Sequence, residues 1–144
     1  MQHSFFQKTD LMQVATSPYS FHMITAELDH WLRDIGAVEG LLTLLVKHTS
    51  ASLTIQENAD PTVRDDLLTI LNELAPEDRD YKHNMEGPDD MPAHIKTMLT
   101  NSTLSIPVIE GKMDLGTWQG VYLIEHRAHR MNRFIRLFYA GTNE

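Results

Sequence analysis

The chain has 144 residues, of which 42% are hydrophobic and 22% charged, and its formal net charge is −8. The length suits a single domain over residues 1–144, and the composition is ordinary for a globular protein. The negative charge argues against nucleic acid as a partner, and the absence of cysteine excludes disulfides, thiolate catalysis and cysteine-based zinc sites.

The N-terminal part predicts two short strands and a helix. The opening residues MQHSFFQKTD lack a signal-peptide pattern and no apolar run has the length of a membrane span, so we expect a cytoplasmic protein without membrane contact. Strands are predicted over His3–Lys8 and Tyr19–Ile24, separated by a turn at Ser17–Pro18. A helix is expected over Thr25–Ile35 with Thr25 as its N-cap, and Gly36 suits its C-terminal cap.

The next stretch joins a buried strand to a polar cluster. The run GLLTLLV over Gly40–Val46 has the length and composition of a strand buried on both faces. A second strand is predicted over Ala51–Gln56. Between them stand His48, Thr49 and Ser50, where the imidazole could act as acid–base group or ligand and the hydroxyls could bind substrate oxygens. Ordinary turn hydrogen bonding is the alternative for the hydroxyls.

The strongest helix start in the chain is Asp60-Pro61, an N-cap aspartate followed by proline in the first turn. The apolar residues of this helix form one stripe that ends before Pro76: Val63, Leu67, Ile70, Leu71 and Leu74.

The segment Tyr81–Lys96, YKHNMEGPDDMPAHIK, is polar and rich in helix breakers, so burial alone does not account for it. Asp90 is the expected N-cap of a short helix with Pro92 in its first turn, which places Asp90 and His94 on one helix face. His83 and Asp89 would approach from the preceding loop. Such a group of imidazoles and carboxylates suits a metal ion or proton transfer, although the aspartates could also be a plain helix cap.

The C-terminal third predicts only strands and loops. Strands are expected over Thr103–Ile109, Val121–Glu125 and Phe134–Tyr139. The LGTWQG motif of Leu115–Gly120 could present backbone N–H groups to an anion or simply form a tight hairpin, and the basic loop His126–Arg133 could bind phosphate or lie in solvent. Few helices among about seven strands, without βαβ alternation, predict an α+β domain on antiparallel sheet with two to three helices.

Three blocks of the sequence resemble the YjbQ-like family, also called the secondary thiamine-phosphate synthase family. They are HTSASLTIQENADPTVRDDL (His48–Leu67), YKHNMEGPDDMPAHIK (Tyr81–Lys96) and LGTWQGVYLIEHRAHR (Leu115–Arg130). The resemblance implies a β-sandwich core, a homotrimer with polar residues near subunit boundaries, and low-level thiamine-phosphate synthase activity. That activity joins hydroxymethylpyrimidine diphosphate to a thiazole phosphate with loss of diphosphate.

The residues and the resemblance together give a hypothesis for the site. It is a transferase pocket for a small phosphorylated metabolite, assisted by a divalent ion such as Mg or Zn and by no organic cofactor. Two alternatives are a metal-dependent hydrolase or lyase and a non-catalytic module that binds a small ligand or metal. The expected metal ligands are His83, Asp89 and Asp90; the expected catalytic residues are His48, His94 and Glu125; the expected substrate-binding residues are Thr49, Ser50, Glu57, Asn58, Asp60, Gln119 and Arg127.

Overall fold

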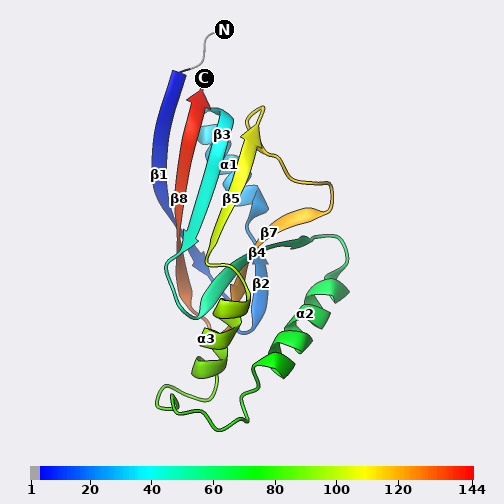
Figure 1. The fold of residues 1–144 in the computed structure, drawn as a ribbon. Helices are drawn as coiled ribbons and strands as arrows, with labels where there is room; N and C mark the ends of the chain where they lie inside the picture. The colour runs from blue at the N-terminus through cyan, green and yellow to red at the C-terminus, as the bar shows by residue number, and fades with distance from the viewer. Residues whose placement is uncertain (1–3) are drawn as a thin grey trace.

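Two antiparallel sheets pack around one core in the computed structural model, which describes residues 4–144 (Figure 1). Together with three helices they confirm the predicted α+β class and the sandwich. The five-stranded sheet has the order β1-β8-β3-β5-β6: β1 (Ser4–Ala15), β8 (Asn132–Asn143), β3 (Ala37–Val46), β5 (Thr103–Ile109) and β6 (Lys112–Met113). The three-stranded sheet has the order β2-β7-β4: β2 (Ser20–Met23), β7 (Gln119–Glu125) and β4 (Ala51–Glu57).

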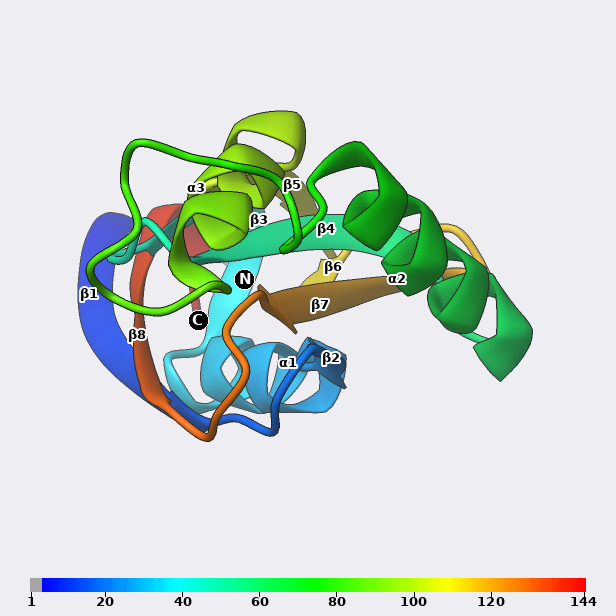
Figure 2. The same cartoon turned by 90° about the horizontal axis from the view of Figure 1, so that it is seen from below.

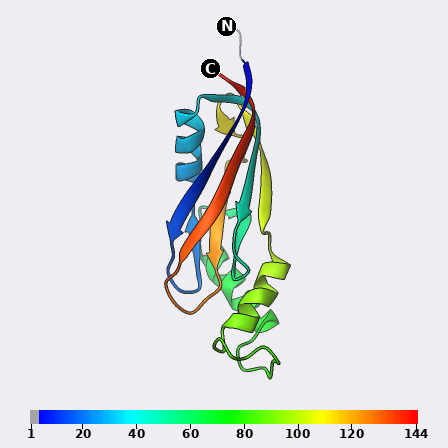
Figure 3. The same cartoon turned by 90° about the vertical axis from the view of Figure 1, so that its left-hand side faces the viewer.

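Strand β3 alternates between the core and the outside, so the expectation that it is buried on both faces is wrong for the single chain. Leu42 and Leu44 are fully buried in the core shared with the small sheet, whereas Leu41 and Leu45 on the other face are 43% and 42% exposed. Successive side chains of a strand point to opposite faces, and here only one face is covered (Figure 3). The sheet thus leaves an apolar outer surface.

The first strand runs further than the sequence predicts. Strand β1 continues to Ala15 and pairs with β8 at every residue from Ser4 to Ala15. The polar residues that follow Lys8 concealed this continuation, because one face of β1 is exposed and needs no apolar side chains. The predicted start at His3 lies outside the described residues.

Three helices are present in the described part of the chain: α1 (Thr25–Asp34), α2 (Pro61–Leu74) and α3 (Asp90–Leu99). The N-cap of α2 is Asp60, as predicted, and its side chain accepts from the N–H of Thr62. The N-caps expected for the other two helices are each one residue too late: they are Ile24 for α1 and Asp89 for α3. The Thr25 hydroxyl instead accepts from the N–H of Val121, which ties α1 to β7.

Helix α2 stands at the edge of the molecule beyond β4 (Figures 1 and 2). None of its residues is buried, and the stripe that was expected to face a core includes Ile70 at 50% and Leu74 at 62% exposure. Polar contacts hold α2 to the body: Arg64 donates to the hydroxyl of Tyr122 at 3.0 Å. Across residues 4–144, every helix is too short or too polar to cross a bilayer.

Two glycines let β3 and β8 approach closely. Gly40 pairs with Gly141, and a Cβ on Gly141 would lie 2.3 Å from the carbonyl oxygen of Glu39 and 2.7 Å from the Tyr139 hydroxyl. The strand register shifts at this point, between Ala37 and Gly40. Only glycine fits without movement of backbone atoms.

Candidate functional site

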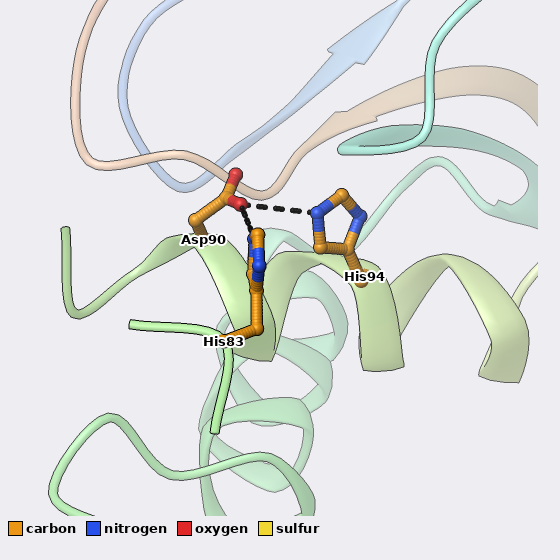
Figure 4. A group of neighbouring side chains, drawn as sticks. All are labelled: His83, Asp90 and His94. Atoms are coloured by element: carbon orange, nitrogen blue, oxygen red, sulfur yellow. Dashed lines mark hydrogen bonds and ion pairs between the residues drawn. The ribbon is translucent and has the colours of Figure 1, made fainter. Parts of the chain in front are cut away.

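Three polar side chains converge where α3 begins (Figure 4). Asp90 is the first residue of α3, His94 follows one helical turn later, and His83 reaches in from the loop that joins α2 to α3. The Oδ2 atom of Asp90 lies 2.6 Å from His83 Nε2 and 3.0 Å from His94 Nε2. The predicted pairing of Asp90 with His94 and the approach of His83 are therefore confirmed.

The local sequence explains why Asp90 is fixed at this point. Pro92 is tolerated in the first turn of α3 because its missing N–H would have no partner there, and the positive end of the helix dipole favours a carboxylate at Asp90. Burial alone raises the pKa of Asp90. The hydrogen bond from His83 and the positive charges of the surrounding groups lower it by more, so the pKa of Asp90 lies below its usual range and the group is a carboxylate.

The hydrogen bonds of His94 fix its tautomer. Its Nδ1 lies 2.9 Å from the carbonyl oxygen of Thr49, and because that oxygen can only accept, Nδ1 carries the proton. In the neutral imidazole, Nε2 then presents a bare lone pair toward the Asp90 carboxylate. A lone pair that faces a carboxylate oxygen at 3.0 Å is an arrangement that a cation between the two atoms would stabilise.

The three residues fit a divalent cation. One ligand atom from each of His83, Asp90 and His94 lies within 4.8 Å of the others. Zinc bonds of about 2.0–2.1 Å in a tetrahedron place ligand atoms roughly 3.3 Å apart, so the two contacts of Asp90 Oδ2, at 2.6 and 3.0 Å, need to lengthen by less than about 1 Å. The Nδ1 contact of His94 with a backbone carbonyl is the arrangement that metal-ligating histidines adopt.

Asp89 does not join this group. Its Oδ2 accepts from Arg127 Nε and from the N–H of Ala128, both at 2.8 Å. Arg127 also donates from Nη1 to Asp90 Oδ1 at 2.8 Å and from Nη2 to the carbonyl oxygen of Glu86 at 3.1 Å. The guanidinium that the sequence suggested for substrate binding is thus engaged at all three nitrogens, by the loop before α3 and by the first residue of α3.

Glu125 forms a buried ion pair with Arg133 and also contacts the backbone of Arg127. Arg133 donates from Nε and Nη2 to Glu125 at 2.8 and 2.5 Å, and the N–H of Arg127 donates to Glu125 Oε2 at 3.0 Å. Burial raises the pKa of Glu125, but the hydrogen bonds from Arg133 and Thr16 lower it by more, so its pKa lies below the usual range. Glu125 is 0% exposed, so it contacts the rest of the network and not solvent.

Three other residues expected near the site, His48, Thr49 and Ser50, make hydrogen bonds that hold the surrounding structure in place. The Nε2 of His48 accepts from the N–H of Phe134 at 2.9 Å, and burial lowers the pKa of His48, with the charge of Arg133 adding to the effect. Thr49 contributes its carbonyl to His94, and Ser50 accepts from Arg133 Nη2 through both its carbonyl and its hydroxyl.

Four of the expected substrate-binding residues lie at the other end of the small sheet. Glu57 pairs with Gln119 at one end of β4, whereas Ala51 pairs with Glu125 at the other. Six steps along a strand span about 20 Å, so these residues do not meet the His83–Asp90–His94 group within one chain. Glu57 Oε2 accepts from the N–H groups of Ala59 and Asp60, and Gln119 Oε1 accepts from the N–H of Gly116. The other two of these four expected substrate-binding residues are Asn58 and Asp60, which follow β4 in the chain.

A cavity of about 260 Å³ adjoins the candidate site and is lined in part by Arg79, Tyr81 and His83. A larger cavity of about 530 Å³ lies near Arg33 and Glu144, at the opposite end of the five-stranded sheet. The smaller cavity is bordered by a member of the converging group and the larger one is not.

Sequence reasoning missed three buried basic residues. Arg133 is 2% exposed, Lys96 3% and His126 2%. Lys96 donates to Asn72 Oδ1 at 2.6 Å, and His126 Nε2 lies 2.8 Å from the hydroxyl of Ser52. Arg133 and His126 sit at the two ends of a loop whose composition is typical of solvated segments, and Lys96 resembles the basic end of a helix, so no local signal marks them as buried.

The sequence of this chain is similar to a family model and to several known proteins. The sequence model described as "UPF0047 protein YjbQ-like" matches residues 10–142. A UPF0047 protein of Synechocystis sp. is 44% identical over 139 residues, which cover 96% of this chain and 95% of the relative. The UPF0047 protein YjbQ of Escherichia coli O157:H7 is 44% identical over 131 residues, which cover 90% of this chain and 94% of the relative.

Solved structures give the same similarity. A crystal structure of a YjbQ/UPF0047-family protein from Clostridium acetobutylicum is 35% identical, with a TM-score of 0.80 over 89% of this chain and 98% of that chain. A conserved hypothetical protein from Thermus thermophilus is 36% identical, with a TM-score of 0.79 over 89% of this chain and 97% of that chain.

Proposed function

The chain belongs to the UPF0047 protein YjbQ-like family, and we propose that it is a divalent-metal-assisted enzyme that acts on a small phosphorylated metabolite. The reaction to test first is thiamine-phosphate synthesis, which the resemblance of the three sequence blocks implies. The observation that carries the proposal is the meeting of three potential ligand atoms from His83, Asp90 and His94 at the start of α3.

A cation accounts for this meeting better than hydrogen bonds alone. The contact of His94 Nδ1 with Thr49 leaves Nε2 free to bind a metal, and the pKa of Asp90 is lowered so that it remains a carboxylate. When bound, a divalent cation would neutralise charge on the departing diphosphate. Asp90 and the two histidines hold that position at the edge of the cavity that His83 lines.

Of the two histidines, His94 is the one whose free nitrogen faces the converging group, because Nε2 of His48 already accepts from the backbone of Phe134. The backbone carbonyl of Thr49 fixes His94 with Nε2 toward that group, so His94 fits the role of metal ligand, and its Nε2 is then not available for proton transfer.

The proposal is tested with chelator-stripped protein reloaded with Zn²⁺, Mn²⁺ or Mg²⁺. Turnover of hydroxymethylpyrimidine diphosphate and thiazole phosphate should appear with metal and be lost in Asp90→Ala and His94→Ala, with little change in Tm for His94→Ala because that side chain is one-third exposed. Asp114→Ala, an exposed acid outside the group, is the matched control and should keep full activity. Turnover that survives both site substitutions would refute the assignment.

The same protein separates the two rival functions. Hydrolysis of phosphate esters at a higher rate than condensation would favour a hydrolase with synthase turnover as a side reaction. Stoichiometric metal retention without turnover of any phosphorylated substrate would favour a binding module.

We also propose that the chain works as a homotrimer. Support comes from the exposed apolar face of the five-stranded sheet, where Leu41 and Leu45 stand on the same side of β3, and from the exposed Ile70 and Leu74 of α2. Sedimentation velocity should give a species of three times 16.5 kDa, and Leu41→Lys should reduce it to monomer. A monomeric wild-type protein would refute the trimer.

A further inference from the structure

We propose that Arg127 is a positioning residue of the metal centre, one that turns the Asp90 carboxylate toward the cation and keeps Asp89 away from it. This inference rests on the proposed function of the same site. It assigns to Arg127 a role distinct from the phosphate binding expected from the sequence.

The two oxygens of Asp90 are divided between different partners. Oδ1 accepts from Arg127 Nη1 at 2.8 Å, and Oδ2 is the atom that faces His83 and His94. A carboxylate held at one oxygen cannot rotate, so its other oxygen stays at the point where the imidazoles meet. The Asp90 side chain is 3% exposed, and water does not compete for these contacts.

The guanidinium is itself held as a rigid part. Its Nε donates to Asp89 Oδ2, its Nη2 donates to the carbonyl of Glu86, and its side chain is 14% exposed. A planar guanidinium with three separate acceptors in fixed directions has one orientation, which a lysine ammonium does not reproduce. Asp89, whose Oδ2 accepts from Arg127 and Ala128, therefore anchors the arginine and does not act as a ligand.

The orientation of His94 depends on the same buried network. His94 is fixed by the carbonyl of Thr49, and the next residue, Ser50, is held by Arg133 through its carbonyl and hydroxyl. Arg133 pairs with Glu125, which also accepts the N–H of Arg127. One connected network of ion pairs and hydrogen bonds thus orients both the carboxylate and the histidine.

Charge and positioning predict opposite results when Arg127 is removed. If Arg127 acted only through its positive charge, its loss would tighten cation binding, because like charges repel. If it acts by positioning, its loss weakens binding, because the buried Asp90 carboxylate loses the partner that holds Oδ2 toward the two imidazoles.

The test is metal binding by chelator-stripped wild type, Arg127→Lys, Arg127→Met and Arg130→Met. Arg130 is the matched control, an exposed arginine of the same loop. Zn²⁺ affinity is measured by competition with a chromophoric chelator, and bound Co²⁺ is followed by its visible absorption, which reports ligand geometry. We expect Arg127→Met to bind Zn²⁺ about 10- to 100-fold more weakly and with an altered Co²⁺ spectrum, Arg127→Lys to fall between, and Arg130→Met to match wild type.

The outcomes distinguish this inference from the function on which it rests. Wild-type protein that binds neither Zn²⁺ nor Co²⁺ refutes the metal centre itself. Wild-type binding with unchanged or tighter affinity in folded Arg127→Lys and Arg127→Met, as judged by circular dichroism, overturns the positioning role and leaves the centre standing. If Arg127→Met does not fold, Arg127→Lys decides alone.

Discussion

The fold should become less stable as the pH falls, because His126 is buried in its neutral form. His126 is 2% exposed, and its burial, together with the nearby charge of Lys96, lowers its pKa to about 3. In the unfolded chain the pKa of this histidine is about 6.5. Between the two pKa values, the unfolded state therefore binds a proton that the native state does not bind. The stability that depends on neutral His126 is therefore complete above pH 6.5 and is lost as the pH falls toward 3.

The expected loss can be worked out at pH 5.0. There the unfolded histidine is protonated and the folded one is not, so the gap of about 1.5 pH units below the unfolded pKa costs about 2 kcal/mol. Any folded-state pKa below about 4 gives nearly the same loss at this pH, because the native group remains neutral throughout.

The assay is urea unfolding followed by circular dichroism at pH 7.5 and pH 5.0. The comparison is between wild type and His126→Gln, which retains a group able to reach the Ser52 hydroxyl but cannot titrate. Other titrating groups affect both proteins equally, so the wild type should lose about 2 kcal/mol more than His126→Gln between the two pH values. His129→Gln, at an exposed position, is the control and should follow wild type. Equal losses in wild type and His126→Gln would refute the reasoning.

Three further outcomes follow from the contacts of buried groups. Asp90→Asn should weaken Zn²⁺ binding more than about 100-fold and Asp89→Asn less than about 10-fold, measured by chelator competition; equal losses would make both residues ligands. Glu125→Gln should lower the free energy of unfolding by about 3–5 kcal/mol, since it leaves a buried guanidinium without its counter-charge; a loss under about 1 kcal/mol in urea unfolding would contradict this. Gly141→Ala should lower Tm by several degrees because its Cβ would lie 2.3 Å from a backbone oxygen, while Gly116→Ala, 3.3 Å from a side-chain atom, should change little.

Local patterns in the sequence were enough to predict much of the fold. The Asp60-Pro61 signal predicted the start of α2, and the spacing of Asp90 and His94 predicted their contact on α3. Both depend on residues within one helical turn, where the physics is short-range. The α+β class and the antiparallel sheets followed from the absence of regular βαβ alternation.

The rest depended on contacts between residues far apart in the chain. Arg127 meets Asp90 across 37 positions, and Arg133 meets Ser50 across 83, so no window of sequence could pair them. The exposure of Leu41 was missed for a related reason. An apolar residue in a strand indicates a face that packs against other groups, but it does not show whether those groups belong to the same chain or to another one. Glu57 and Gln119 were expected at the site, but they occupy the far end of the strand pair.

Helix α2 carries an apolar stripe that its own chain leaves partly uncovered, at Ile70 and Leu74. An isolated helix of 14 residues is marginal in water, and most helical stability comes from packing. In the trimer proposed above, dilution that separates the subunits should melt α2 before the sheets: its amide hydrogens should exchange faster as the protein is diluted, while those of β3 and β8 stay protected. The hydrogen-exchange rate of α2 would then depend on the concentration of the protein.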